Sequence, residues 1–175
     1  NYTDEFYGLT TMRTGIEKSR NLMTVRLANR IGMKKILKMA ENFDISEGID
    51  DKLSMSLGSG VITLKDITNV YAIIANGGKK IEPKLITSIY SKDGKKIYDT
   101  RLKNCIECKI DFLSKEIKIP KITEEKNIVI DPRLAYQITS MMEGVVLRGT
   151  AKNLKELDVP IAGKTGTTNE NKDAW

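Results

Sequence analysis

Residues 161–168 read IAGKTGTT, and this run says more about the fold and chemistry of the 175-residue chain than any other. Its GKT triplet invites comparison with a phosphate-binding loop, G-x-x-x-x-G-K-[ST], which cradles phosphates in backbone amides and starts a helix at the lysine. That pattern needs a first glycine at position 158, which is Asp158, and Pro160 interrupts the loop. The residues at 167–169, TTN, are poor helix starters. The sequence therefore disfavours a phosphate-binding loop.

The same run contains Lys164-Thr165-Gly166, the K-T-G that serine acyl-transfer enzymes combine with S-x-N and S-x-x-K. A strand near residues 159–168 would present Lys164 and the alternating hydroxyls of Thr165 and Thr167, because side chains alternate with period two. Such a ledge of Thr165, Gly166 and Thr167 can bind a substrate carboxylate through charge-assisted hydrogen bonds. Gly166 would keep the opposite face clear for close packing. The alternative is a surface strand that happens to contain KTG.

A second short motif, Ser19-Arg20-Asn21, lies at the junction between two predicted helices. Taken alone it has a simple explanation, because a serine before a helix is ordinarily its N-cap. Its weight comes from the pair of motifs. An S-x-N between helices, followed more than a hundred residues later by K-T-G, is typical of serine acyl-transfer enzymes. This pairing makes Ser19, Asn21 and Lys164 the candidate catalytic residues.

Helical periodicity and capping signals account for most of the remaining chain. Apolar residues recur at three- and four-residue spacing, Thr63 and Asp131-Pro132 mark two helix starts, and Gly32 separates two neighbouring helices. The expected helical segments run from Thr10 or Thr11 to Lys18, over 22–31, over 33–43, from Thr63 to 75, from Asp131 to 147, and over 151–157.

Residues 84–100 form a predicted hairpin with Asp93-Gly94 in its turn. Residues 101–126 show no sustained periodicity and many lysines, so we expect a variable insertion there. Both cysteines fall in this insertion, as the C-x-x-C of Cys105 and Cys108. A zinc site would need two more ligands, and the chain has no further cysteine and no histidine. We expect an incidental or disulfide-bonded surface pair.

The composition excludes several kinds of chemistry. The absence of histidine rules out Ser-His-Asp and Cys-His catalysis, HExxH metalloproteases and imidazole zinc sites. The net charge of +6 is concentrated in residues 61–126, with 14 basic and 9 acidic residues and no Arg-aromatic interleaving. This pattern favours a solvated lysine face over a nucleic-acid groove. The 40% hydrophobic content fits a globular chain, and no apolar run reaches the roughly 18 residues of a membrane span.

Longer stretches match a known family. In chain order they are NY at 1–2, FYG at 6–8, TMR at 11–13, SRNL at 19–22, LGSG at 57–60, ANGG at 75–78, EP at 82–83, RGTA at 148–151 and GKTGTT at 163–168. With these stretches the chain resembles the transpeptidase domain of class A high-molecular-weight penicillin-binding proteins, of the 1A type found in Gram-negative bacteria. The resemblance covers most of the chain, and residues 101–126 are the least diagnostic part.

The resemblance implies an α/β (α+β) acyl-serine transferase fold, mainly helical in this segment, whose sheet is mainly antiparallel. It implies that Ser19 passes a proton to the leaving D-alanine amine, and that Asn21 orients the general-base lysine and binds the substrate amide. Lys164 would supply positive potential. The hydroxyls of Thr165 and Thr167 would hold the terminal carboxylate of a D-Ala-D-Ala stem peptide or of a β-lactam antibiotic. The Thr167 N–H would join the oxyanion hole, where one donor is worth about 3 kcal/mol. The resemblance implies no cofactor and no metal.

One part of the family pattern is missing from the 175 residues. None of the nine serines has lysine three residues later, so the S-x-x-K that supplies nucleophile and general base is not present. We therefore expect an internal segment of a partial domain, with S-x-x-K upstream of Asn1 and further strands beyond Trp175. Alone, this segment is expected neither to react with penicillin nor to transfer peptides.

The resemblance also describes a parent protein. It implies an additional glycosyltransferase domain and a single-pass anchor on the periplasmic side of the bacterial inner membrane, where other cell-wall synthesis proteins could be partners. Two alternatives share the motifs: a serine β-lactamase or D,D-carboxypeptidase relative, which passes the acyl group to water, and a non-catalytic β-lactam-sensor or cell-wall-binding domain. The context of Ser19 and of residues 148–151 argues against the hydrolytic relatives.

Overall fold

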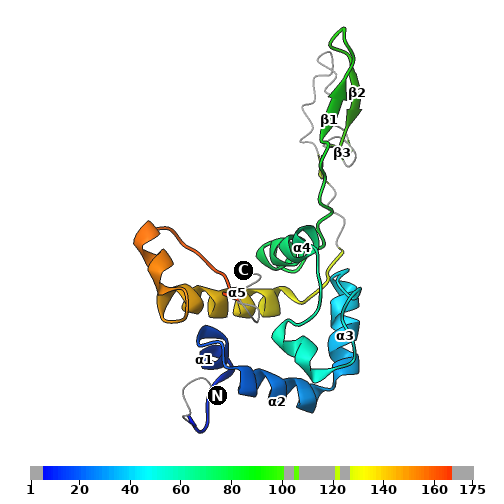
Figure 1. Ribbon diagram of the computed structural model, residues 1–175. Coiled ribbons are helices and arrows are strands. Elements are labelled where there is room, and N and C mark those ends of the chain that lie inside the picture. Colours follow the sequence, from blue (N-terminus) through cyan, green and yellow to red (C-terminus); the bar gives the residue numbers. More distant parts are fainter. Residues whose placement is uncertain (1–5, 101–104, 107–120, 123–126, 167–175) are drawn as a thin grey trace. The chain divides into compact units, whose positions relative to one another are not determined.

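The computed structural model describes residues 6–100, 105–106, 121–122 and 127–166 (Figure 1). The chain divides into two compact units, which are described separately. The first unit comprises residues 1–81 and 128–175 and carries the helices. The second unit, residues 82–127, carries the strands.

Helices build the first unit, as the sequence predicts. In chain order they are α1 (Met12–Glu17), α2 (Asn21–Ile31), α3 (Met33–Asn42), the 3-10 helix η1 (Leu53–Leu57), α4 (Leu64–Ala75), α5 (Pro132–Leu147) and the 3-10 helix η2 (Lys152–Leu157). All the expected helical segments are present, and η1 is an addition. Among the described residues, no helix has the length and apolar character that crossing a membrane requires.

Side-chain caps fix where three of these helices begin. The hydroxyls of Thr11 and Thr63 each accept a hydrogen bond at 3.2 Å from the backbone N–H three residues later. Asp131 caps α5 ahead of Pro132, by accepting from the backbone N–H of Arg133 at 2.8 Å. Hydrogen bonds from the Arg133 guanidinium, and then from its N–H, lower the pKa of Asp131 to about 2. Each cap satisfies a backbone donor that the helix itself leaves unpaired.

A hydrophobic cluster joins the end of α3 to α4 and α5. Its buried members are Phe43, Ile73, Ile130 and Ala135. Beside it, the carbonyl of Gly78 accepts from the N–H groups of Val129 at 2.8 Å and of Ile130 at 3.3 Å. Gly78 has φ +84°, and a Cβ there would overlap the Ile130 carbonyl, so this position requires glycine. This core holds α5, whose C-terminal end leads to the candidate site.

The second unit contains the predicted hairpin. Strand β1 (Ser88–Tyr90) pairs antiparallel with β2 (Lys96–Asp99), with one irregularity in register. Gly94 in the connecting turn has φ +76°, as the Asp-Gly turn signal requires. The prediction of a hairpin over 84–100 is confirmed, although its paired strands are shorter than that range.

A second strand pair lies where the sequence predicts only an insertion. Strand β3 (Cys105–Ile106) pairs antiparallel with β4 (Lys121–Ile122). Strands of two residues are too short to show the alternation by which strands are recognised, so periodicity could not find them. Cys108 lies outside the described residues, and a disulfide between the two cysteines stays a prediction.

The expected strand near residues 159–168 is not formed over residues 159–166, and residues 167 and 168 lie outside the described part of the chain. A strand requires a neighbouring strand to pair its backbone groups. In the described part of the chain, residues 159–166 contact a helix instead of a strand. The Gly163 N–H donates to the carbonyl of Met142 in α5 at 3.4 Å. The overall prediction of a mixed fold, mainly helical with antiparallel strands, is confirmed.

Candidate active site

Ser19 lies in the tight turn between α1 and α2. Its φ is +53°, in the left-handed region that residues with a side chain seldom adopt. The Ser19 N–H donates to the Ile16 carbonyl at 3.2 Å, and the Arg20 N–H donates to the Gly15 carbonyl at 2.9 Å. Arg20 is the N-cap of α2, so the interpretation of Ser19 as a helix cap is wrong. The turn leaves Ser19 exposed at the helix junction.

The structure brings Lys164 to Ser19. The Lys164 ammonium donates a short hydrogen bond to Ser19 Oγ, across 145 positions of sequence, and a second one of 2.7 Å to the carbonyl of Thr165. Lys164 is half-buried, and this burial lowers its pKa from the usual lysine value because water no longer fully solvates the charge. The S-x-N and K-T-G motifs therefore meet in one place, as their pairing in the sequence predicts.

The remaining K-T-G residues are placed in part. Thr165 is half-buried, and its Oγ1 lies 2.5 Å from Oγ1 of Thr150, with either hydroxyl able to donate. Gly166 follows and is exposed. Thr167 lies outside the described residues, so its place in the ledge stays a prediction.

Asn21, the last candidate, is the first residue of α2 and is exposed next to the Ser19 turn. Its neighbour Arg20 stacks its guanidinium over the ring of Tyr7, 3.1 Å from the ring centroid. This cation–π contact holds the middle residue of the motif against the chain that precedes α1. The roles of Asn21 toward a substrate and a general base stay predictions.

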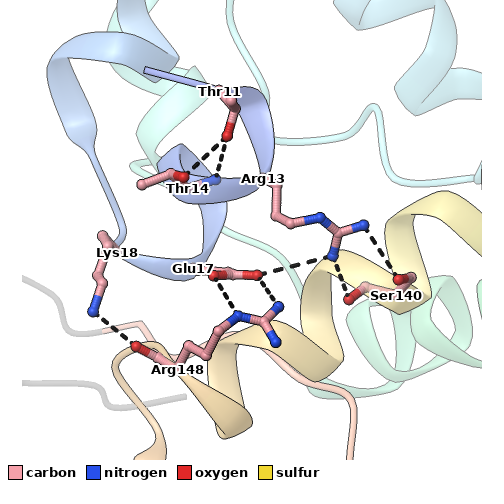
Figure 2. Close-up of polar contacts among 7 residues, drawn as sticks. All are labelled: Thr11, Arg13, Thr14, Glu17, Lys18, Ser140 and Arg148. Atoms are coloured by element: carbon pink, nitrogen blue, oxygen red, sulfur yellow. Dashed lines mark hydrogen bonds and ion pairs between the residues drawn. The ribbon is translucent and has the colours of Figure 1, made fainter. Parts of the chain in front are cut away.

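A buried acidic residue, Glu17, connects the end of α1 to α5 (Figure 2). Glu17 is only 5% exposed. Arg148 donates two hydrogen bonds to its carboxylate, from Nη2 to Oε1 at 2.5 Å and from Nε to Oε2 at 3.3 Å. These hydrogen bonds raise the pKa of Arg148 above its ordinary value. Arg13 lies 3.9 Å from the same carboxylate and donates to the Ser140 carbonyl at 2.9 Å. The buried charge is therefore paired by a forked, charge-assisted contact.

Two further hydrogen bonds reinforce this connection. Lys18 Nζ donates to the Arg148 carbonyl at 2.7 Å, which Figure 2 also shows, and the Thr150 N–H donates to the Glu17 carbonyl at 3.2 Å. The two residues directly before Ser19 are thus both bonded to the segment that follows α5.

Two glycines allow this close approach. A Cβ on Gly144 would overlap the Glu17 carboxylate, and a Cβ on Gly149 would overlap the Glu17 carbonyl. The RGTA stretch at 148–151 belongs to the family resemblance, but the sequence predicts no role for Glu17 or Thr150. A single glutamate on a short helix is normally a solvent-facing residue, and only the mid-helix Gly144 hinted at a close contact.

Among the described residues, no group of three acidic or cysteine side chains could hold a metal ion. The polar side chains that make contact here form two pairs, the Lys164 ammonium with the Ser19 hydroxyl and the Thr150 hydroxyl with the Thr165 hydroxyl. This set can relay a proton through a hydroxyl and attract an anion. Hydroxyl and ammonium groups of this kind can serve acid–base chemistry in a site that has no histidine.

Residues 1–174 match the penicillin-binding protein transpeptidase domain, and the chain belongs to this family. Similar curated proteins carry a more specific name. The chain is 46% identical to penicillin-binding protein 1A of Rickettsia bellii and 32% identical to that of Neisseria meningitidis, over its whole length in both comparisons. The chain spans only 22% of the first relative and 20% of the second.

Solved structures show the same fold. A crystal structure of penicillin-binding protein 1A from Haemophilus influenzae matches with a TM-score of 0.81 and 27% identity, covering all of this chain and 29% of that one. Penicillin-binding protein A from M. tuberculosis, solved as an imipenem acyl-enzyme complex, matches with a TM-score of 0.70 over 97% of this chain and 39% of its own. Its 21% identity makes that second match a likeness of fold alone.

Proposed function

We propose that this chain is the part of a peptidoglycan D,D-transpeptidase that carries the S-x-N and K-T-G motifs, in a protein whose S-x-x-K lies outside these 175 residues. The observation that supports the proposal most strongly is the hydrogen bond from Lys164 Nζ to Ser19 Oγ, which unites the two motifs. Family membership and the relatives named penicillin-binding protein 1A agree with it.

The geometry suits Ser19 to relay a proton. Because Ser19 Oγ accepts from the Lys164 ammonium, its own O–H is free to donate to the nitrogen of the leaving group. The serine of S-x-x-K would attack the carbonyl of the penultimate D-alanine and form an acyl-serine, and its proton would pass to that motif's lysine. Ser19 then protonates the departing D-alanine amine and regains a proton from the lysine of S-x-x-K. A positioned acid–base group of this kind contributes about 10²–10⁴-fold to the rate.

Lys164 supplies the positive charge of the site. Its partial burial lowers the pKa of Lys164, and the same exclusion of water reduces the screening of its charge toward an anion. The substrate anion is the terminal carboxylate of a stem peptide ending in D-Ala-D-Ala, or the carboxylate of a β-lactam that takes its place. The hydroxyls of Thr165 and Thr167, with Gly166 between them, would receive it.

The second half of the reaction transfers the acyl group. An amine of a neighbouring stem peptide would lose its proton through the same relay, attack the acyl-serine, and form the cross-link while the serine is released. We further propose that the whole protein joins this domain to a glycosyltransferase and is anchored at the periplasmic side of the inner membrane, where cell-wall synthesis partners would meet it. The lengths of the relatives, about five times that of this chain, leave room for these parts.

The proposal is tested by two assays on the full-length protein. Covalent labelling with a fluorescent penicillin detects the acyl-serine, and incubation with a stem peptide and an amine acceptor measures transfer. We expect labelling and a cross-linked product with the full-length protein, and no labelling of the isolated 175-residue chain. Release of the acyl group to water alone would favour a carboxypeptidase or β-lactamase. Labelling without any turnover would favour a sensor domain, and labelling of the isolated chain would contradict the proposed site of the nucleophile.

A further inference from the structure

Ser19 has few contacts of its own that could fix it. It is exposed, its backbone is in the left-handed region, and its hydroxyl is bonded to Lys164. The two residues before it are instead held firmly. The Glu17 carboxylate binds Arg148, the Lys18 ammonium binds the Arg148 carbonyl, and the Glu17 carbonyl accepts from Thr150 (Figure 2). Because the Ser19 N–H donates to the Ile16 carbonyl, the position of Ser19 depends on how the end of α1 is held.

The K-T-G segment is attached to the same part of the molecule. The Gly163 N–H donates to the Met142 carbonyl near the end of α5 at 3.4 Å, and the Thr165 hydroxyl contacts the Thr150 hydroxyl at 2.5 Å. Residues 142–150 thus contact both the K-T-G segment and the two residues that precede Ser19. A shift of α1 relative to this stretch would move Ser19 while leaving the Thr165 ledge in place.

We propose that Glu17 is a positioning residue for Ser19, which acts by fixing the end of α1 on Arg148; this proposal rests on the proposed function. The Glu17 side chain is 7% exposed and the Arg148 side chain is 54% exposed, so Arg148 can turn to water whereas Glu17 cannot. If residue 17 has no charge, the Arg148 guanidinium is more stable in water than in contact with it. The forked contact then opens, and the Ser19 hydroxyl drifts from the Lys164 ammonium.

The test substitutes Glu17→Gln in the full-length protein, which keeps the size of the side chain and removes its charge. Stopped-flow labelling with a fluorescent penicillin yields the dissociation constant of the non-covalent complex and the rate constant of acylation separately. Misplacing a catalytic group by about 1 Å can cost about 10²-fold. We expect the acylation rate constant to fall about tenfold to a hundredfold, and the dissociation constant to stay within twofold because the carboxylate ledge is untouched.

Two controls separate positioning from general destabilisation. Ile73→Val removes one methylene from the core under α4, away from the motifs, and should leave both constants within twofold of the parent. In a Ser19→Ala background, Glu17→Gln should cause no further loss, because its effect runs through Ser19. The proposal is overturned if Glu17→Gln leaves acylation unchanged, if Ile73→Val slows it equally, or if the losses at Glu17 and Ser19 multiply. Absence of labelling in the unmodified protein would instead overturn the proposed function itself.

Discussion

The two sides of the Lys164–Ser19 contact are held in different ways. On the Ser19 side, α1 is fixed to α5 by the buried Glu17–Arg148 pair and by hydrogen bonds from Lys18 and to the Glu17 carbonyl. On the Lys164 side, an extended segment is held among the described residues by one backbone hydrogen bond from Gly163 and one hydroxyl contact at Thr165. The proposed proton relay therefore depends on helix packing, and the proposed anion ledge on a few local contacts. Substitutions on each side should have distinguishable effects.

Removing the contact itself should have the largest effect. We expect Lys164→Ala to lower the second-order rate constant of β-lactam acylation by about 10²–10³-fold in the full-length protein, because it removes both the positive charge and the partner of Ser19. Labelling kinetics with a fluorescent penicillin measure this. Lys155→Ala, which removes an exposed lysine of η2, is the matched control and should stay within twofold. Equal rates in the two variants would show that residues 161–166 do not form part of the site.

The next largest effect concerns the Ser19 side. Gly149→Ala places a Cβ against the Glu17 carbonyl and against the backbone of Val145, where there is no space for it. Overpacking of this kind costs about 1–3 kcal/mol. We expect the midpoint of thermal unfolding of the transpeptidase domain to fall, together with acylation. Gly163→Ala is the control for stability, because open space surrounds that position. A Gly149→Ala protein as stable as Gly163→Ala would contradict the close packing of α1 on α5.

A smaller effect is expected on the Lys164 side. Thr150→Val keeps the shape of the side chain but removes the hydroxyl that contacts Thr165. A hydrogen bond of this type contributes about 0.5–1.5 kcal/mol, so the non-covalent β-lactam complex should weaken by up to about tenfold. The acylation rate constant should change little, which is the reverse of the pattern expected for Glu17→Gln. Thr150→Ser should restore binding, and a loss confined to the acylation rate would contradict this division of roles.

The smallest effect should come from the second unit. Changing Cys105 and Cys108 together to serine should leave acylation within twofold, because the unit of residues 82–127 contributes none of the candidate catalytic residues. The same labelling assay measures this, with and without reducing agent. A large loss of acylation would indicate that the two cysteines form a structural disulfide.

Capping and periodicity sufficed to predict the helices of the first unit. Thr11, Thr63 and Asp131 mark helix starts through local hydrogen bonds that need no tertiary partner. All three are N-caps in the structure, as expected. The strand expected at 159–168 is a different matter, because strand pairing depends on a neighbour that local sequence does not specify. The same reason explains why β3 and β4 were missed.

The sequence predicted the motifs of the candidate site, but it did not predict the contacts that hold them in place. The pairing of S-x-N with K-T-G made Ser19 and Lys164 candidates for one site, and the structure places their side chains in contact. The burial of Glu17 arises from the packing of α1 on α5, across more than a hundred residues of sequence. The left-handed backbone of Ser19 belongs to the local turn that ends α1, in which the N–H groups of Ser19 and Arg20 donate to carbonyls of that helix. The sequence of the six-residue helix α1 does not by itself predict that Glu17 contacts α5.

We expect Ser19 and Lys164 to act as one unit in acylation. A double-mutant cycle with Ser19→Ala, Lys164→Ala and the double variant in the full-length protein tests this most directly, with the acylation rate constant as the quantity measured. We expect the double variant to be no slower, within about threefold, than the slower of the two single variants. Losses that multiply would mean that the two residues act independently, and would contradict the claim.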